Sequence, residues 1–150
     1  MANKFFPVSI DLNNKNVLVI GAGNIAYRKI ETLLKYNCNI KVITKDISEK
    51  NILSLYEKKK IELINSKAFE EKDLENIFLV VAATDNEEIN KNISDLCIKK
   101  NILVNNITSK NDMNLRFMSI CEKDDIQIAV SANGNPKKAV EIKNKIKELI

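Results

Sequence analysis

The chain has 150 residues, of which 45% are hydrophobic and 29% charged, a balance typical of one globular domain or of one domain with a small appendage. Its formal charge of +4 comes from interspersed lysines and acids without a basic run that alternates with aromatic residues, so we expect no nucleic-acid partner. The absence of histidine excludes a histidine base, a Ser-His-Asp triad and a histidine metal site.

No stretch approaches the ~18 apolar residues of a membrane-spanning helix, and residues 1–7 lack the apolar core of a signal peptide. We therefore expect a cytoplasmic protein without a membrane partner. The three cysteines, Cys38, Cys97 and Cys121, form no C-x-x-C pair. Their odd number and scattered positions predict reduced thiols, and their spacing gives no support for a metal site.

The first half of the chain alternates short apolar runs with amphipathic segments, after an extended lead-in over residues 5–12 and a turn over 13–16. The predicted strands are residues 17–20, 40–43 and 61–64. The predicted helices are residues 24–36 and 47–60. We expect Ser48 to cap the second helix, and its inward-facing residues to be Ile52, Leu53, Leu55 and Tyr56.

Residues 77–83 form a continuous apolar run, as expected of a strand that a parallel sheet buries on both faces. A predicted helix over 86–100 and a predicted strand over 102–107 follow. Strands that alternate with helices indicate an α/β fold, a Rossmann-type doubly wound parallel sheet with the strand order 3-2-1-4-5.

The alternation breaks after Ile107. A polar loop over 108–115 leads to two short strands, 116–121 and 126–130, whose short connection predicts a hairpin. A final helix over 136–150 begins with Asn135 as its N-cap and proline at its first position. We therefore expect a Rossmann domain over 1–112, followed over 113–150 by a small hairpin and a C-terminal helix.

The first predicted strand runs directly into Gly21-Ala22-Gly23-Asn24-Ile25-Ala26. Gly21 lets the chain turn, Gly23 leaves the path of a phosphate open, and Ala26 lets the helix lie close to the strand. A G-x-G-x-x-A pattern is weak by itself, but here it lies between an apolar strand and an amphipathic helix. This context predicts a dinucleotide pyrophosphate held by Gly21, Ala22, Gly23, Asn24 and Ile25.

Two further strand ends complete the predicted cofactor site. After the second strand, Asp46 can bond the adenosine ribose, which favours NAD. Lys45 can instead approach a 2′-phosphate, and both residues can equally form an exposed turn. The fourth strand ends in Ala83-Thr84-Asp85, where the small alanine leaves room for the cofactor. Asp85 or Asn86 can alternatively cap the next helix.

These segments together resemble the precorrin-2 dehydrogenases, the amino-terminal part of siroheme synthases. Residues 21–29 are similar to that family's G-G-G-x-V-A-x-R-K segment, and the Arg28-Lys29 continuation separates it from a generic Rossmann pattern. Ala82-Ala83-Thr84-Asp85 with Asn90 resembles its A-A-T-D…N segment. Looser matches are the lead-in Phe6-Pro7-Val8-Ser9-Ile10-Asp11-Leu12, Val104-Asn105, Phe117 with Ser119, and residues 131–136.

The resemblance implies NAD-dependent oxidation of precorrin-2, a tetrapyrrole with eight carboxylates, to sirohydrochlorin in siroheme synthesis. It also implies that residues 1–112 are the NAD-binding domain and that residues 113–150 are the dimerisation region of a homodimer, with the small dimerisation hairpin. The family's helical C-terminal module is short or missing here. Substrate-binding residues would be Asn114, Ser119 and Lys138. Lys138 lies in the first turn of the last helix, where free N–H groups and lysines can gather carboxylates or simply face solvent.

One departure concerns the catalytic position. The family carries an aspartate where this sequence has Thr108, and a hydroxyl cannot accept a proton as a carboxylate does. Asp112 lies in the same loop at a different spacing, and Met118 replaces a proline. We therefore predict a dehydrogenase, with Thr108 and Asp112 at the reacting end, that does not insert iron efficiently. The alternatives are a catalytically impaired nucleotide-binding and dimerising module, and a Rossmann domain that regulates a transport assembly.

Overall fold

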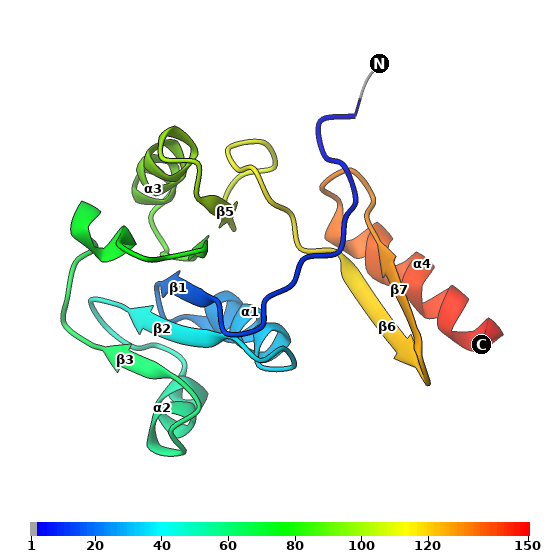
Figure 1. The fold of residues 1–150 in the computed structure, drawn as a ribbon, viewed down its shortest axis with the longest axis horizontal. Coiled ribbons are helices and arrows are strands. Elements are labelled where there is room, and N and C mark those ends of the chain that lie inside the picture. The colour runs from blue at the N-terminus through cyan, green and yellow to red at the C-terminus, as the bar shows by residue number, and fades with distance from the viewer. Residues whose placement is uncertain (1–2) are drawn as a thin grey trace. The chain divides into compact units, whose positions relative to one another are not determined.

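The computed structural model describes residues 3–150, which form two compact units, 3–115 and 116–150 (Figure 1). The division falls three residues beyond the predicted boundary at 112/113. The first unit contains all of the parallel strands, and the second contains the hairpin and the last helix. In the described part of the chain, no helix is long and apolar enough to cross a bilayer.

The first unit is built on a five-stranded parallel sheet with the order β3-β2-β1-β4-β5, as predicted. Its strands are β1 (Asn16–Ile20), β2 (Asn39–Ile43), β3 (Glu62–Ile64), β4 (Leu79–Ala82) and β5 (Leu103–Asn106). Helices α1 (Asn24–Leu33), α2 (Lys50–Glu57) and α3 (Glu87–Lys99) connect them, with a 3-10 turn, η1 (Glu71–Leu74), between β3 and β4. The order reverses between β1 and β4, which is the place where doubly wound sheets bind their ligands.

Both faces of the central strands are buried, which explains why β4 and the residues of β1 after Asn16 are apolar. Leu18, Ile20, Val80 and Val104 join one core cluster with Ile93 and Cys97 of α3. Because side chains alternate along a strand, Val17, Val19 and Val81 face the opposite side, and they too are fully buried. The fold thereby holds the carboxyl ends of β1, β2 and β4 together at one edge.

The two first helices are shorter than predicted. Helix α1 ends at Leu33 because Lys35 and Tyr36 donate to the carbonyls three positions back, which tightens the chain into a turn. Helix α2 begins at Lys50, so the predicted Ser48 cap is wrong. The Glu49 carboxylate accepts the cap bond from the Asn51 N–H instead.

The predicted inward face of α2 is also only partly correct. Ile52 is fully buried, whereas Leu53 is 39% and Tyr56 is 49% exposed. A helix of eight residues presents only two turns, so it buries one side chain and leaves the flanks of its apolar stripe in solvent.

The second unit contains a hairpin of β6 (Ser119–Lys123) and β7 (Ile126–Val130), followed by α4 (Pro136–Leu149). The predicted hairpin is confirmed, although β6 begins at Ser119 instead of residue 116. Asn135 caps α4 by accepting from the Lys138 N–H at 3.1 Å, and proline occupies the first helical position, as predicted. Cys121 and Ala139 are the buried apolar residues of this small unit.

Candidate functional site

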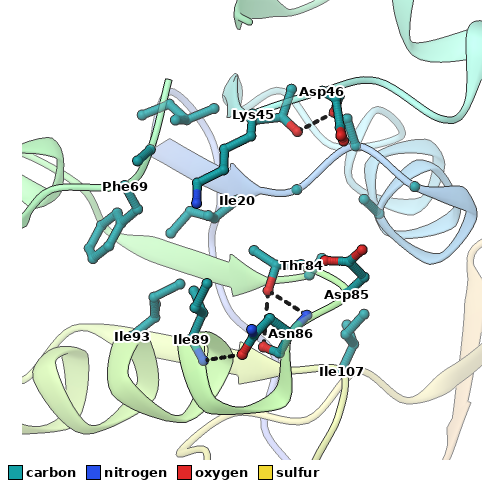
Figure 2. Close-up of a pocket in the computed structure, with 18 of the residues that line it drawn as sticks. Ile20, Lys45, Asp46, Phe69, Thr84, Asp85, Asn86, Ile89, Ile93 and Ile107 are labelled. Atoms are coloured by element: carbon teal, nitrogen blue, oxygen red, sulfur yellow. Dashed lines mark hydrogen bonds between the residues drawn. The ribbon is translucent and has the colours of Figure 1, made fainter. Parts of the chain in front are cut away.

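A cavity of about 860 Å³ opens at the carboxyl ends of β1, β2 and β4, where the strand order reverses (Figure 2). It lies entirely within the first unit. The structure brings all of the residues predicted to contact the cofactor to its wall: Gly21, Ala22, Gly23, Asn24, Ile25, Lys45, Asp46, Ala83, Thr84 and Asp85. Residues far apart in the sequence thus share one concave surface, and their cofactor roles stay predictions.

The turn after β1 passes against the end of β4. Gly21 has a φ of +110°, and a Cβ atom on it would lie 2.2 Å from the carbonyl oxygen of Ala83. Its N–H donates to Ile43 O at 2.9 Å, and the Ala83 N–H donates to Ile20 O at 2.8 Å, so the sheet continues up to the turn. The fold itself therefore requires glycine at position 21.

Gly23 has a different reason to be glycine. Its φ of −95° suits any residue, and a Cβ atom would meet only Ser48 Oγ at 3.5 Å, an ordinary contact. It is the N-cap of α1, and no side chain caps that helix. The N–H groups of the first turn therefore face an open cradle that a phosphate can occupy, which is what a dinucleotide pyrophosphate requires.

The loop after β2 forms the wall on the side of the predicted ribose. The Thr44 hydroxyl donates to the carbonyl oxygen of Asp46 and bends the chain there. In Figure 2 the Lys45 side chain extends into the cavity toward Ile20 and Phe69. Because Lys45 and Asp46 both line the cavity, a cation and a carboxylate are each available to an adenosine ribose or its 2′-phosphate.

The far wall of the cavity was not predicted from the sequence. Phe69, in the loop after β3, and Ile89, Ile93 and Leu96 of α3 form an apolar lining there. The helical spacing of the three α3 residues was visible in the sequence, but such a stripe ordinarily indicates core packing. The irregular loop around Phe69 carries no signal of its place. A flat apolar lining of this kind suits an aromatic ring such as adenine.

An ion pair holds the loop that carries Phe69. Lys67 Nζ lies 2.7 Å from Asp73 Oδ2, and the same oxygen accepts the Glu70 N–H at 2.8 Å. Burial raises the pKa of the Asp73 carboxyl, but the Lys67 and Glu70 hydrogen bonds and the charges of Lys67 and Lys72 together lower it below its ordinary value. The carboxylate is therefore stabilised in its charged form and fixes the start of η1.

The fully buried Asn90 holds the end of β4 in place. Its Oδ1 accepts from the Thr84 N–H at 3.1 Å and from the Thr84 hydroxyl at 2.6 Å. Its Nδ2 donates to Thr84 O at 3.0 Å and to Thr108 Oγ1 at 3.2 Å. All of its hydrogen-bonding groups are used inside the protein, so Asn90 positions Thr84 and does not bind a ligand.

Of the two candidate caps of α3, Asn86 is the one used. Its Oδ1 accepts from the Ile89 N–H at 3.0 Å. Asp85 is exposed, lines the cavity, and makes no hydrogen bond or ion pair among residues 3–150. The acidic residue of this pair therefore remains available to a ligand.

The predicted catalytic residues lie outside the cavity wall. The Thr108 hydroxyl donates to Asn106 Oδ1 at 2.9 Å and accepts from Asn90. Asp112 lies in the loop after β5, where its N–H donates to Ser109 Oγ at 2.9 Å, and its charge raises the pKa of Lys91 together with the larger effect of Asp95. Neither residue faces the space in which the predicted cofactor residues meet.

The predicted substrate residues have local structural roles. Asn114 Oδ1 accepts the Val104 N–H at 2.7 Å and its Nδ2 donates to Ile102 O at 3.0 Å, so its amide covers the free edge of β5. Ser119 and Lys138 belong to the second unit, at the start of β6 and in the first turn of α4. Their contact with a substrate stays a prediction.

The cysteines give no catalytic group to the site. All three thiols are free. Burial raises the pKa of the Cys97 thiol to about 12, so it is protonated and unreactive near neutral pH. In the part of the chain that the structure describes, no group of three or more Cys, Asp or Glu side chains is placed to hold a metal ion.

The doubly wound sheet, the switch point and the open helix N-terminus define a nucleotide-binding Rossmann domain. The chain belongs to the family described as "Putative NAD(P)-binding", which matches residues 8–119. It is 38% identical to a siroheme synthase of Mannheimia succiniciproducens, over 87% of this chain and 27% of that protein. A siroheme synthase of Actinobacillus succinogenes is 34% identical over 97% of this chain and 30% of that protein.

The solved structure of SirC, a precorrin-2 dehydrogenase, superposes with a TM-score of 0.82 at 29% identity, over 97% of this chain and 71% of that chain. The resemblance to precorrin-2 dehydrogenases and the amino-terminal part of siroheme synthases is thereby confirmed. The chain spans less than a third of the length of these siroheme synthases. The description of its family names NAD(P) binding, and the solved protein that it resembles is a dehydrogenase.

Proposed function

We propose that this protein oxidises precorrin-2 to sirohydrochlorin with NAD. The observation that carries the proposal is the open cradle at Gly23. The fold has space for a side chain there, but the sequence has none, and no side chain caps the first turn of α1. The similarity to a precorrin-2 dehydrogenase over nearly the whole chain supports the substrate.

In this proposal, residues 21–25 hold the pyrophosphate through backbone N–H groups, and Asp46 bonds the adenosine ribose. Ala83, Thr84 and Asp85 lie against the nicotinamide half, because β4 ends on the other side of the switch point from β2. When bound, the nicotinamide ring accepts a hydride from the substrate. Asn90 keeps the end of β4 in one position, so the chain contributes mainly orientation and exclusion of water.

We favour NAD over NADP because a carboxylate near a ribose accepts its hydroxyls and repels a 2′-phosphate. The Asp46 side chain supports this choice, and the Lys45 ammonium opposes it. Calorimetric titration that compares the affinities for NAD and NADP decides whether Asp46 or Lys45 contacts the ribose. Tighter binding of NADP than of NAD would assign the ribose site to Lys45.

The substrate carries eight carboxylates, which fits a chain with a net charge of +4. We propose that Lys138, Ser119 and the first turn of α4 meet these carboxylates. We also propose a homodimer formed through the hairpin, because two short strands with one helix have exposed edges and little core of their own. A monomer by sedimentation at micromolar concentration would contradict the dimer.

The direct test mixes the protein with precorrin-2 and NAD under anaerobic conditions and follows NADH and sirohydrochlorin by absorbance. Equal amounts of both products are expected. A catalytically impaired nucleotide-binding module is the second candidate, because the Thr108 hydroxyl is bonded inside the protein and lies outside the cavity wall. Nucleotide binding without either product would favour that second candidate.

A further inference from the structure

Oxidation of the proposed substrate removes two hydrogens, one with its electron pair and one as a proton, so a positioned proton acceptor would speed the reaction. Thr108 cannot supply it, because a hydroxyl is a poor proton acceptor and both of its hydrogen-bonding partners are protein groups. Asp112 does not line the cavity. The base must therefore be sought among the carboxylates that do line the cavity.

Two carboxylates line the cavity, Asp46 and Asp85. Asp46 follows β2 and lies on the adenosine side of the switch point. Asp85 follows β4, beside the cavity residue Ile107 that follows β5. Figure 2 shows Asp85 and Ile107 on one side of the cavity and Phe69, on the apolar far wall, on the opposite side. Asp85 is thus the carboxylate on the side where the nicotinamide and the substrate would meet.

The structure keeps Asp85 in place and leaves its side chain unused. Asn90 bonds both the N–H and the C=O of the preceding residue, Thr84, which fixes the backbone from which Asp85 projects. Asn86, and not Asp85, caps α3. The Asp85 carboxylate has no partner among residues 3–150. A fixed backbone with an unpaired carboxylate is the arrangement that a positioned proton acceptor requires.

We propose that Asp85 is the catalytic base of this protein, in the place of the aspartate that the family resemblance implies at position 108; the inference rests on the proposed function. One C–H bond of the substrate breaks with its electron pair leaving as hydride to the oxidised nicotinamide. The second hydrogen leaves as a proton to the Asp85 carboxylate, and its bonding electrons stay in the tetrapyrrole as a new double bond. The proton then passes to water, to which Asp85 is open.

The test compares Asp85→Asn with two other single changes. Glu88→Gln is the matched control, because it removes an exposed carboxylate from the first turn of α3 that does not line the cavity. Asp112→Asn tests the competing carboxylate. In single turnovers with NAD and precorrin-2, Asp85→Asn should be slower by roughly 10²–10⁴-fold, the usual contribution of a general base. Glu88→Gln and the parent should react equally fast.

Two readouts do not depend on turnover. Calorimetry should give closely similar NAD affinities for Asp85→Asn and the parent, because the nicotinamide half lies against the backbone of Asp85 while its carboxylate meets the substrate. In protein with ¹³C-labelled aspartate carboxyls, sirohydrochlorin added without nucleotide should move the resonance that is missing in Asp85→Asn. Added formate should also restore part of the rate of Asp85→Ala, which a purely structural role does not predict.

The contradicting results are distinct from one another. Unchanged turnover in Asp85→Asn, or a loss confined to Asp112→Asn, overturns the assignment while the proposed function stands. A parallel loss of NAD affinity makes Asp85 a cofactor-binding residue and also overturns it. If the parent binds NAD but forms no sirohydrochlorin, the proposed function fails and this inference fails with it.

Discussion

Gly21 and Ala83 lie so close together that a Cβ atom on Gly21 would come within 2.2 Å of the Ala83 carbonyl oxygen. The turn after β1 thus rests directly on the end of β4, and this contact forms the floor of the cavity. Two positions further on, Gly23 has space for a side chain. The two glycines of one motif therefore have separate physical roles, one in the fold and one in the site.

Gly21→Ala should destabilise the protein. The new Cβ would overlap the backbone of Ala83, and the φ of +110° is strained for alanine, so we expect the free energy of unfolding to fall by at least about 2 kcal/mol. Urea unfolding measures this loss. Gly23→Ala is the control, with a loss of less than about 1 kcal/mol expected. Equal stability of the two variants would contradict the assigned roles.

Asn90→Ala should loosen the end of β4. The change leaves the half-buried N–H of Thr84 without its partner and opens a small void where the buried Asn90 side chain was, so we expect a loss of about 2–4 kcal/mol in the free energy of unfolding. Amide hydrogen exchange at Thr84 should accelerate more than exchange in β1. Glu88→Ala, on the exposed side of the same helix, serves as the control. Slow exchange at Thr84 in the Asn90 variant would show that the hydrogen bonds from Asn90 are not needed to hold the end of β4.

The Lys67–Asp73 pair predicts a pH dependence. The pKa of the Asp73 carboxyl is lower in the folded protein than its ordinary value, so its contribution to stability is full above that ordinary value, about 4, and is lost as the pH falls through the folded-state pKa. Asp73→Asn should therefore cost about 1–3 kcal/mol at pH 7. The difference between parent and variant should shrink as both are acidified below pH ~4. A difference that grows on acidification would refute this sign.

Iron insertion should be slow. Metal insertion into a tetrapyrrole requires pyrrole N–H protons to leave, and Thr108 occupies the position where the family resemblance implies an aspartate. Assays of iron insertion into sirohydrochlorin with the parent and Asp112→Asn measure it. Fast insertion by the parent would refute the prediction. Fast insertion that is lost in Asp112→Asn would show that the base has moved along the loop.

The sheet and the glycine turn could be predicted because their signals are local. A buried parallel strand is uniformly apolar, as residues 79–82 are, and the turn needs small residues within a few positions of residue 21. Helix ends were less predictable. The cap of α2 is Glu49 and not Ser48, at a place where the N–H groups of both residues bond Ala22 O at 3.2 Å, a long-range contact that no local pattern marks.

The far wall and the true surroundings of the loop after β5 could not be predicted. Phe69 reaches the cavity only because an ion pair holds an otherwise irregular loop, and no periodic pattern marks such a contact. Asn114 was expected to face a substrate, yet its amide bonds the edge of β5, which depends on where the loop returns. The bonding of Thr108 likewise depends on Asn90, which is distant in the sequence.

Titration of NAD into Gly23→Val tests the central claim most directly. Valine suits the φ of −95° at this position, and its Cβ makes only an ordinary contact with Ser48, so the variant should fold with an unfolding midpoint close to that of the parent. Its branched side chain would fill the phosphate cradle at the start of α1. We expect the parent to bind NAD and Gly23→Val to bind at least about 100-fold more weakly, a loss of about 2.7 kcal/mol. Equal NAD affinity in a folded Gly23→Val protein would contradict the account.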